Sequence, residues 1–78
     1  MENLVIIYEK YKNKQYSVEE LLHSFSSLLI PDGKYNLFRK YENYLEEICF
    51  LVNSSDQYDK TIKLLKEMSV SVFNLKLI

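Results

Sequence analysis

The sequence predicts an all-α protein, a small antiparallel bundle of three to four helices in a single domain over residues 1–78. Two observations indicate this fold class. Apolar residues recur three or four positions apart through most of the chain, which is the period of an amphipathic α-helix. Residues that start or stop helices separate these periodic segments, among them a Pro-Asp-Gly turn at 31–33. Since 47% of the residues are hydrophobic, the chain has material for one core.

Each end of the chain is compatible with two structures. Residues 4–11 place their apolar side chains on one helical face, and lysines at 10, 12 and 14 suit the C-terminal end of a helix. The run LVII at 4–7 is also typical of a strand, because it is rich in β-branched residues. We expect a helix at the N-terminus. The C-terminal VSVFNLKLI, 70–78, fits a short helix or a strand, and a two-stranded sheet joining the two ends is the main alternative.

The second helix is predicted to start at Ser17 and to run through the segment SVEELLHSFSSLLI. Ser17 and Glu20 have the S-x-x-E spacing of a capping box, and Tyr16 with Leu21 occupies the positions of a hydrophobic staple. The turn at 31–33 should end this helix. Its expected apolar stripe consists of Val18, Leu21, Leu22, Phe25, Leu28 and Leu29.

Two further helices complete the expected bundle. One runs from about Asn36 to Val52 and has a wide apolar face. Another follows the break at 53–55, capped either by Ser54 with Gln57 or by Asp56 with Asp59. The predicted core includes Leu21, Leu22, Phe25, Leu45, Ile48, Leu51, Ile62 and Leu65.

Catalytic and metal-binding residue patterns are missing from the sequence. His23 is the sole histidine, and we expect a solvated surface imidazole, because a general base needs a substrate-facing pocket and an orienting partner. With Cys49 as the sole cysteine, one chain cannot form a structural zinc site. One glycine cannot form a phosphate-binding loop. We therefore expect no enzyme, no catalytic residues, no metal and no cofactor.

Charge and targeting signals restrict the partners and the location. The formal net charge is −1, which gives no general attraction to nucleic acid or to an anionic membrane. The start, MENLVIIYEKYK, lacks the basic residues and the long apolar run of a signal peptide, and no stretch approaches a membrane span. A single cysteine fits a reducing compartment. The sequence thus predicts a cytoplasmic, soluble protein without a nucleic-acid or membrane partner.

Negative charge is concentrated between Tyr41 and Asp59, a stretch with five acidic residues and no Lys or Arg. Like charges at i,i+4, such as Glu42 and Glu46, mildly destabilise a helix, so the fold does not require them. We predict that the stretch forms one negative surface that docks a cationic partner, with a tyrosine as anchor. A solvated helix face is the alternative interpretation. The predicted binding residues are Glu42, Glu46, Glu47, Asp56, Tyr58 and Asp59.

The same region resembles a family. YENYLEEICFLV at 41–52, followed by Y-x-x-T-I-K-L-L-K-E-M at 58–68, is similar to the central signature of small helical immunity proteins of contact-dependent inhibition and Maf-type polymorphic toxin systems. The family alanine is Tyr44 here, and the glycine often found after the methionine is Ser69. Residues 11–21 more weakly resemble the start of colicin D-type immunity proteins. The matching positions of the central signature are Glu42, Leu45, Glu46, Cys49, Leu64 and Met68.

The resemblance implies a bacterial antitoxin that is monomeric before it binds a cognate toxin domain, an EndoU-type or other RNase, and covers its cleft with acidic side chains. Two other functions stay open. One is a phage- or plasmid-encoded anti-defence or regulatory adaptor protein. The other is a small DNA-binding regulator that would use lysines 10, 12 and 14 with the tyrosines interleaved among them.

Overall fold

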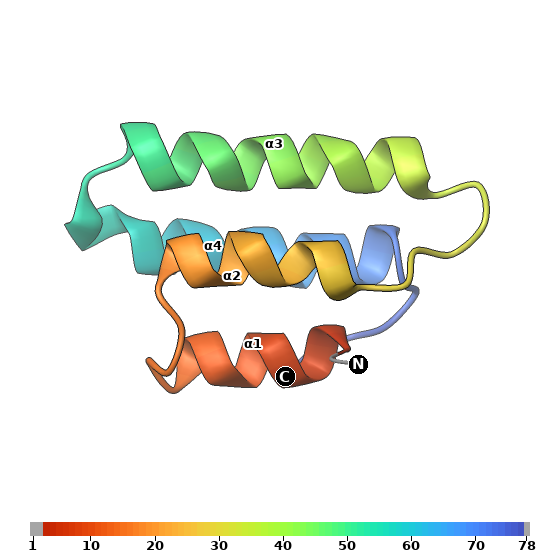
Figure 1. Ribbon diagram of the computed structural model, residues 1–78, viewed down its shortest axis with the longest axis horizontal. Coiled ribbons are helices and arrows are strands. Elements are labelled where there is room, and N and C mark those ends of the chain that lie inside the picture. The colour runs from red at the N-terminus through yellow and green to blue at the C-terminus, as the bar shows by residue number, and fades with distance from the viewer. Residues whose placement is uncertain (1–2, 78) are drawn as a thin grey trace.

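A computed structural model describes residues 3–77 of the chain, and within these residues it contains four α-helices and no strand (Figure 1). The all-α prediction is confirmed, and so is the helix expected at the N-terminus. The helices are α1 (Leu4–Lys12), α2 (Val18–Ser24), α3 (Tyr35–Leu51) and α4 (Ser54–Ser71), with a short 3₁₀ turn, η1 (Phe25–Ser27), directly after α2.

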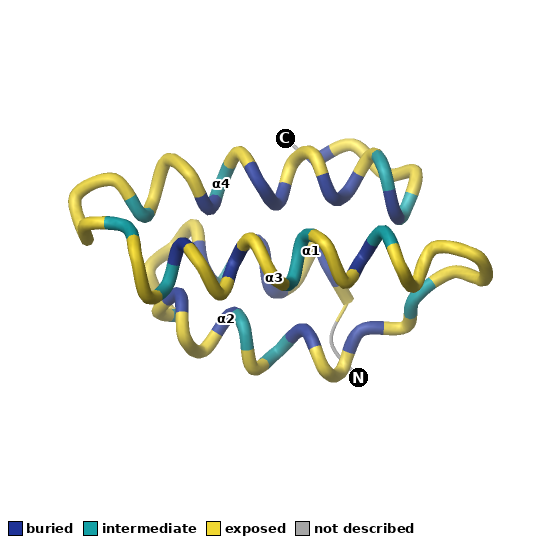
Figure 2. Tube along the Cα trace, turned by 90° about the horizontal axis from the view of Figure 1, so that it is seen from above, coloured by how far each residue is buried: buried dark blue, intermediate teal, exposed yellow. Residues whose placement is uncertain are grey.

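Consecutive helices run in opposite directions, as expected for an antiparallel bundle (Figure 1). In the two perpendicular views, α2 and α4 lie on opposite sides of the bundle, and so do α1 and α3 (Figures 1 and 2). Each helix therefore packs against its two neighbours around one core. Buried positions follow the inward side of every helix, and exposed positions follow the outward side (Figure 2).

Side-chain caps define where the first two helices begin. Asn3 Oδ1 accepts a hydrogen bond of 3.0 Å from the Ile6 N–H at the start of α1. The capping box predicted for α2 is present: Ser17 Oγ accepts from the Glu20 N–H, and Glu20 Oε1 accepts from the Ser17 N–H, both at 3.1 Å. These bonds satisfy backbone donors that have no partner within the helix.

The second helix ends earlier than the sequence predicts, at Ser24 rather than at the Pro-Asp-Gly turn. The hydroxyls of Ser24, Ser26 and Ser27 each donate to the carbonyl three residues earlier, at 2.7–2.9 Å. Such local bonds compete with the helical backbone ladder. The chain then continues in extended form, so the prediction that Leu29 lies on the apolar stripe is wrong: its side chain is 73% exposed.

Asn53 precedes the first turn of α4, and neither predicted side-chain cap, at Ser54 or at Asp56, is formed. Gln57 has a different role: its Nε2 lies 3.2–3.3 Å from the carbonyl oxygens of Ile48, Cys49 and Val52. It therefore supplies a donor to carbonyls at the C-terminal end of α3, where helical hydrogen bonding runs out.

For the C-terminal segment the sequence allows either a short helix or a strand, and most of the segment that the structure describes forms neither. Helix α4 extends to Ser71, a turn follows at 72–73, and residues 74–77 are irregular. Asn74 adopts φ 52°, a left-handed conformation that asparagine tolerates, and the Leu75 N–H returns to the Ser69 carbonyl at 2.8 Å. This geometry terminates α4 and folds Leu77 back into the core.

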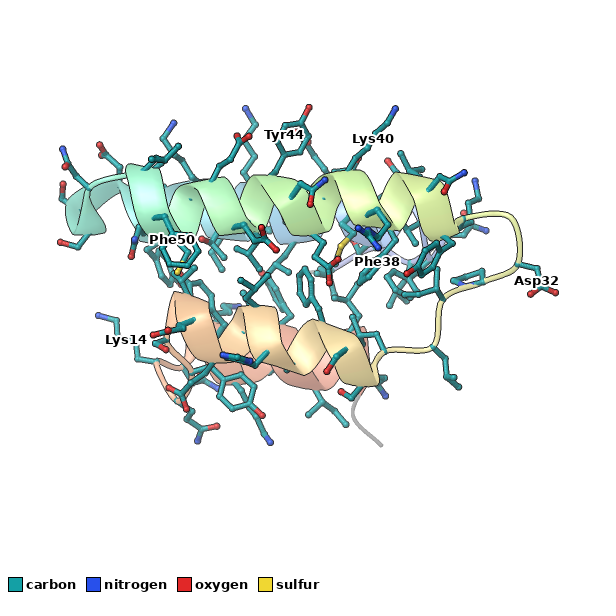
Figure 3. The ribbon with its side chains drawn as sticks, turned by 45° about the horizontal axis from the view of Figure 1, so that its top comes forward. Lys14, Asp32, Phe38, Lys40, Tyr44 and Phe50 are labelled. Carbon is teal, nitrogen blue, oxygen red and sulfur yellow. The ribbon has the colours of Figure 1, made fainter. Side chains whose placement is uncertain are left out.

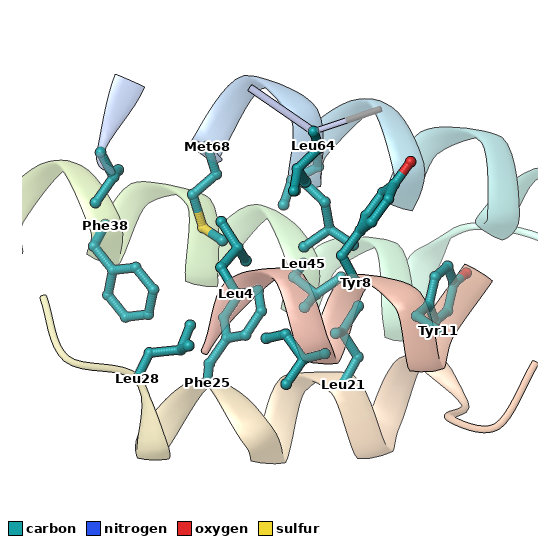
Figure 4. Close-up of a cluster of buried hydrophobic side chains, with 14 of the residues drawn as sticks. Leu4, Tyr8, Tyr11, Leu21, Phe25, Leu28, Phe38, Leu45, Leu64 and Met68 are labelled. Atoms are coloured by element: carbon teal, nitrogen blue, oxygen red, sulfur yellow. The ribbon is translucent and has the colours of Figure 1, made fainter. Parts of the chain in front are cut away.

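The core draws on all four helices (Figure 4). Seven of the eight predicted core residues are buried or packed against it: Leu21, Leu22, Phe25, Leu45, Ile48, Ile62 and Leu65. The prediction for Leu51 is wrong, because its side chain is 80% exposed. The apolar face of α3 is wider than the surface that its neighbours cover, so Leu51 and Tyr44 remain at its solvent edge.

Candidate functional site

Within residues 3–77, no group of His, Cys, Asp or Glu side chains could hold a metal ion, and no helix is long and apolar enough to cross a membrane. His23 is exposed. Cys49 is partly buried, and desolvation, together with the nearby carboxylate of Glu19, raises the pKa of its thiol. Both effects favour the protonated thiol, which is a poor nucleophile.

The predicted acidic residues on α3 fall into two groups. Glu42 and Glu46 are four residues apart and therefore share one stripe of the helix. Arg39, one turn before them, places its Nε 3.8 Å from a Glu42 carboxylate oxygen. A hydrogen bond from Arg39 to the Tyr35 hydroxyl, then the charges of Tyr35, Glu42 and Glu46, raise the pKa of the guanidinium. The negative charge of this stripe is thus offset at its N-terminal end only.

Glu47 lies on another side of the helix, about 100° around from Glu46. It lines a groove between α3 and α4, with Lys60 and Lys63 among the other lining residues. The structure thus separates Glu47 from the stripe of Glu42 and Glu46 and combines it with lysines instead.

Asp56 and Asp59 lie in the first two turns of α4, and both are exposed. Asp56 is in the first turn, where a carboxylate is stabilised by the helix dipole. Among the described residues neither aspartate forms an ion pair, and the same holds for Glu46 and Glu47. These carboxylates are free to act at long range.

Tyr58, predicted as the anchor of the binding surface, packs within the bundle. Its ring stacks on that of Tyr11 in α1, with centroids 5.7 Å apart and planes 17° from parallel. The side chain is 38% exposed, so one edge reaches solvent. This contact joins α1 to α4, and α1 lies on the opposite side of the bundle from α3 (Figure 1).

Sequence reasoning missed an exposed aromatic residue at the end of the α3 stripe. Phe50 is 72% exposed and lies four residues after Glu46, so Glu42, Glu46 and Phe50 occupy successive turns of one helix side. Figure 3 shows Phe50 on the side of α3 toward α2. We call these three residues, Glu42, Glu46 and Phe50, the acidic–aromatic face.

A second surface feature is the α3–α4 groove, which has a volume of about 430 Å³. Its apolar lining includes Tyr41, Ile48 and Leu64, and the exposed side chains of Tyr44 and Leu51 stand at its α3 edge. Figure 3 shows Tyr44 directed outward from α3 beside Lys40. Charged residues at the groove are Glu47 on α3 and Lys60, Lys63 and Glu67 on α4.

The basic N-terminal region has fewer side chains available for binding a nucleic acid than its sequence indicates. The rings of Tyr8 and Tyr11 are buried, so neither is available for stacking on bases. Lys12 Nζ lies 5.8 Å from the Tyr8 ring centroid, and Lys10 Nζ lies 5.2 Å from that of Tyr16. These lysines make cation–π contacts within the domain.

The fold and the two surfaces define a small four-helix domain with an acidic–aromatic face and a separate apolar groove. No protein-family model matches the chain, and no curated protein and no solved structure shows significant similarity to it. The likeness to immunity proteins therefore depends on the sequence motifs alone.

Proposed function

We propose that this chain is a cytoplasmic immunity protein, an antitoxin that binds a cognate bacterial toxin domain with RNase activity and covers its cleft with the acidic–aromatic face. The observation that carries the proposal is the alignment of Glu42, Glu46 and Phe50 on successive exposed turns of α3. The fold does not need this arrangement, because the carboxylates repel one another and the phenyl ring is 72% exposed to water.

The chemistry of an RNase fits such a face. An enzyme that holds a polyanion presents positive potential at its cleft, so carboxylates on an inhibitor are steered toward that cleft and fix the register of binding. Charges at the rim of an interface contribute mostly to association rate. Phe50 supplies what they lack, a large apolar group whose burial would slow dissociation.

The motif that resembles the immunity family separates into two parts in the structure. Leu45 is fully buried and Cys49 is partly buried, so these motif positions serve packing. Glu46 is exposed and Glu42 is partly exposed, so these positions are available to a partner. This division supports a family in which the helix is a scaffold for surface carboxylates. An anti-defence adaptor would use the same face on a different partner, whereas DNA binding has less support because the rings of Tyr8 and Tyr11 are buried.

A growth assay tests the proposal. Candidate toxin domains from genes that neighbour the gene of this chain are each expressed in bacteria alone, with the wild-type chain, or with the variant Glu42→Lys/Glu46→Lys/Phe50→Ser. We expect wild type to restore growth and the variant to fail, because it reverses the charge and removes the apolar contact. All three residues are at least partly exposed, so the variant should fold, and circular dichroism checks this.

The matched control is Asp56→Lys/Asp59→Lys, which reverses two carboxylates of the same acidic stretch outside the acidic–aromatic face. It should protect nearly as well as wild type. If the folded triple variant protects as well as wild type, the face is not the interface. If wild type gives no protection against any neighbouring toxin, the chain is not an immunity protein.

A further inference from the structure

The α3–α4 groove is a second, independent surface that the proposed function does not use. Leu51 is 80% exposed and Tyr44 is 56% exposed, and both stand beside the apolar lining of the groove. The groove is lined by a different side of α3 from the one that carries Glu42 and Glu46. A partner bound to the acidic–aromatic face would therefore leave the groove open.

The charged residues of the groove are balanced. Glu47 and Glu67 contribute two negative charges, and Lys60 and Lys63 contribute two positive ones. None of the four forms an ion pair with another described residue. A groove without net charge favours neither a strongly basic nor a strongly acidic partner, but it does favour a surface with the reverse arrangement of the same charges.

We propose that the α3–α4 groove is the interface of a weak symmetric dimer of this chain. In a two-fold dimer the same patch meets itself, so the patch must be complementary to itself. The groove meets this condition because the negative charge of Glu47 comes from α3 and the positive charges of Lys60 and Lys63 come from α4.

In the proposed dimer the two-fold axis runs along the groove, between the antiparallel helices α3 and α4 (Figure 1). An axis along the groove places α3 of one protomer over α4 of its partner, at the same height and in the opposite direction. Glu47 lines the same groove as Lys60 and Lys63, so each Glu47 would face the lysine pair of the other protomer. Tyr44 and Leu51 of both protomers would then close a shared apolar layer between them.

Size and composition favour a weak association. A 78-residue domain buries a smaller fraction of its unfolded-chain surface than a larger domain does, and self-association is a common way for such domains to cover exposed apolar groups. The exposed apolar groups at the groove edge are only two, so we expect a dissociation constant of about 10–100 µM, in the range of small, transient interfaces. The sequence predicts a monomer; the groove exists only once α3 and α4 are packed together, and it is the reason to propose self-association.

Sedimentation equilibrium of the full chain over a concentration series tests the dimer without any partner. Wild type should change from the mass of one chain to that of two as the concentration rises through about 10–100 µM. Leu51→Ser should weaken association at least tenfold. Leu29→Ser is the matched control, because Leu29 is 73% exposed but does not line the groove, and it should associate like wild type.

A charge exchange tests the symmetry. Glu47→Lys should weaken association, because the introduced positive charge would then face Lys60 and Lys63 of the other protomer. The double variant Glu47→Lys/Lys60→Glu exchanges the net charges of the α3 and α4 walls, keeps the groove without net charge, and should restore association to near the wild-type level. This restoration is not expected if Glu47→Lys acts by damaging the fold.

Four results would overturn the proposal: a one-chain mass for wild type at about 1 mM, unchanged association of Leu51→Ser, no recovery in the double variant after loss in the single one, or a mass above two chains. Since no toxin is present, these results are distinct from failure of the proposed immunity function.

Discussion

The ring of Tyr58 in α4 stacks on the ring of Tyr11 in α1, with centroids 5.7 Å apart and planes 17° from parallel. Tyr11 is buried and Tyr58 covers it from the solvent side. The pair joins the first helix of the chain to the last, across 47 positions of sequence, and gives Tyr58 a structural role.

Removing this contact should destabilise the domain. We expect Tyr58→Ala to lower the free energy of unfolding by about 1–3 kcal/mol, from the lost stacking and the lost apolar burial. Tyr58→Phe keeps the ring and should change stability by less than about 0.5 kcal/mol. Urea unfolding measures both. Equal midpoints for wild type and Tyr58→Ala would contradict the structural role.

The capping box of α2 gives a second prediction. Ser17→Ala removes the acceptor for the Glu20 N–H and should lower the free energy of unfolding by about 1 kcal/mol. Ser55→Ala is the control, because Ser55 is an exposed serine in the first turn of α4 with no cap bond at its side chain. Urea unfolding of the two variants should separate them, and a loss of equal size in both would mean that the box contributes nothing specific.

A pair of leucines on α3 tests the boundary of the core. Leu45 is fully buried, so Leu45→Ala should cost about 2–5 kcal/mol through lost burial and a cavity. Leu51 is 80% exposed, so Leu51→Ala should cost less than about 0.5 kcal/mol. Thermal unfolding at low micromolar concentration, where the proposed dimer is dissociated, measures both. Similar losses would place Leu51 in the core after all.

Tyr11 should make stability depend on pH in the alkaline range. Burial raises the pKa of its phenol above the usual 10.0, and the neighbouring Tyr58 adds to this, while the Thr61 hydroxyl opposes it. Because the folded-state pKa exceeds the unfolded one, the contribution is fully present below pH 10 and is lost as pH rises through the folded pKa. The loss of unfolding free energy between pH 8 and pH 11 should be smaller in Tyr11→Phe than in wild type. An identical loss would show that Tyr11 does not couple to folding.

Local signals made much of the fold predictable. The capping box at Ser17 and the apolar period of residues 36–52 each involve contacts within a few residues, and both predictions hold. The early end of α2 was not predictable from the apolar period, because it coincides with serine hydroxyls competing for carbonyls. Exposure of Leu51 was not predictable either, since it depends on how much of α3 its neighbours cover.

The candidate surface was predictable only in part. Helical spacing correctly places Glu42 and Glu46 on one stripe of α3. Spacing within one helix cannot show that Tyr58 is engaged by Tyr11. Phe50 was an available signal that the sequence analysis did not use. It follows Glu46 by four residues and lies off the apolar stripe, so its exposure beside the acidic residues could have been predicted.

The most direct test of the central claim is the rate at which the chain associates with the purified toxin domain, measured by stopped flow at low and at physiological salt. For Glu42→Lys/Glu46→Lys we predict association slower by about tenfold or more at low salt, with a smaller difference at higher salt, because steering by rim charges is screened. Rates equal to those of wild type at both salt concentrations would contradict the claim that this face of α3 guides binding.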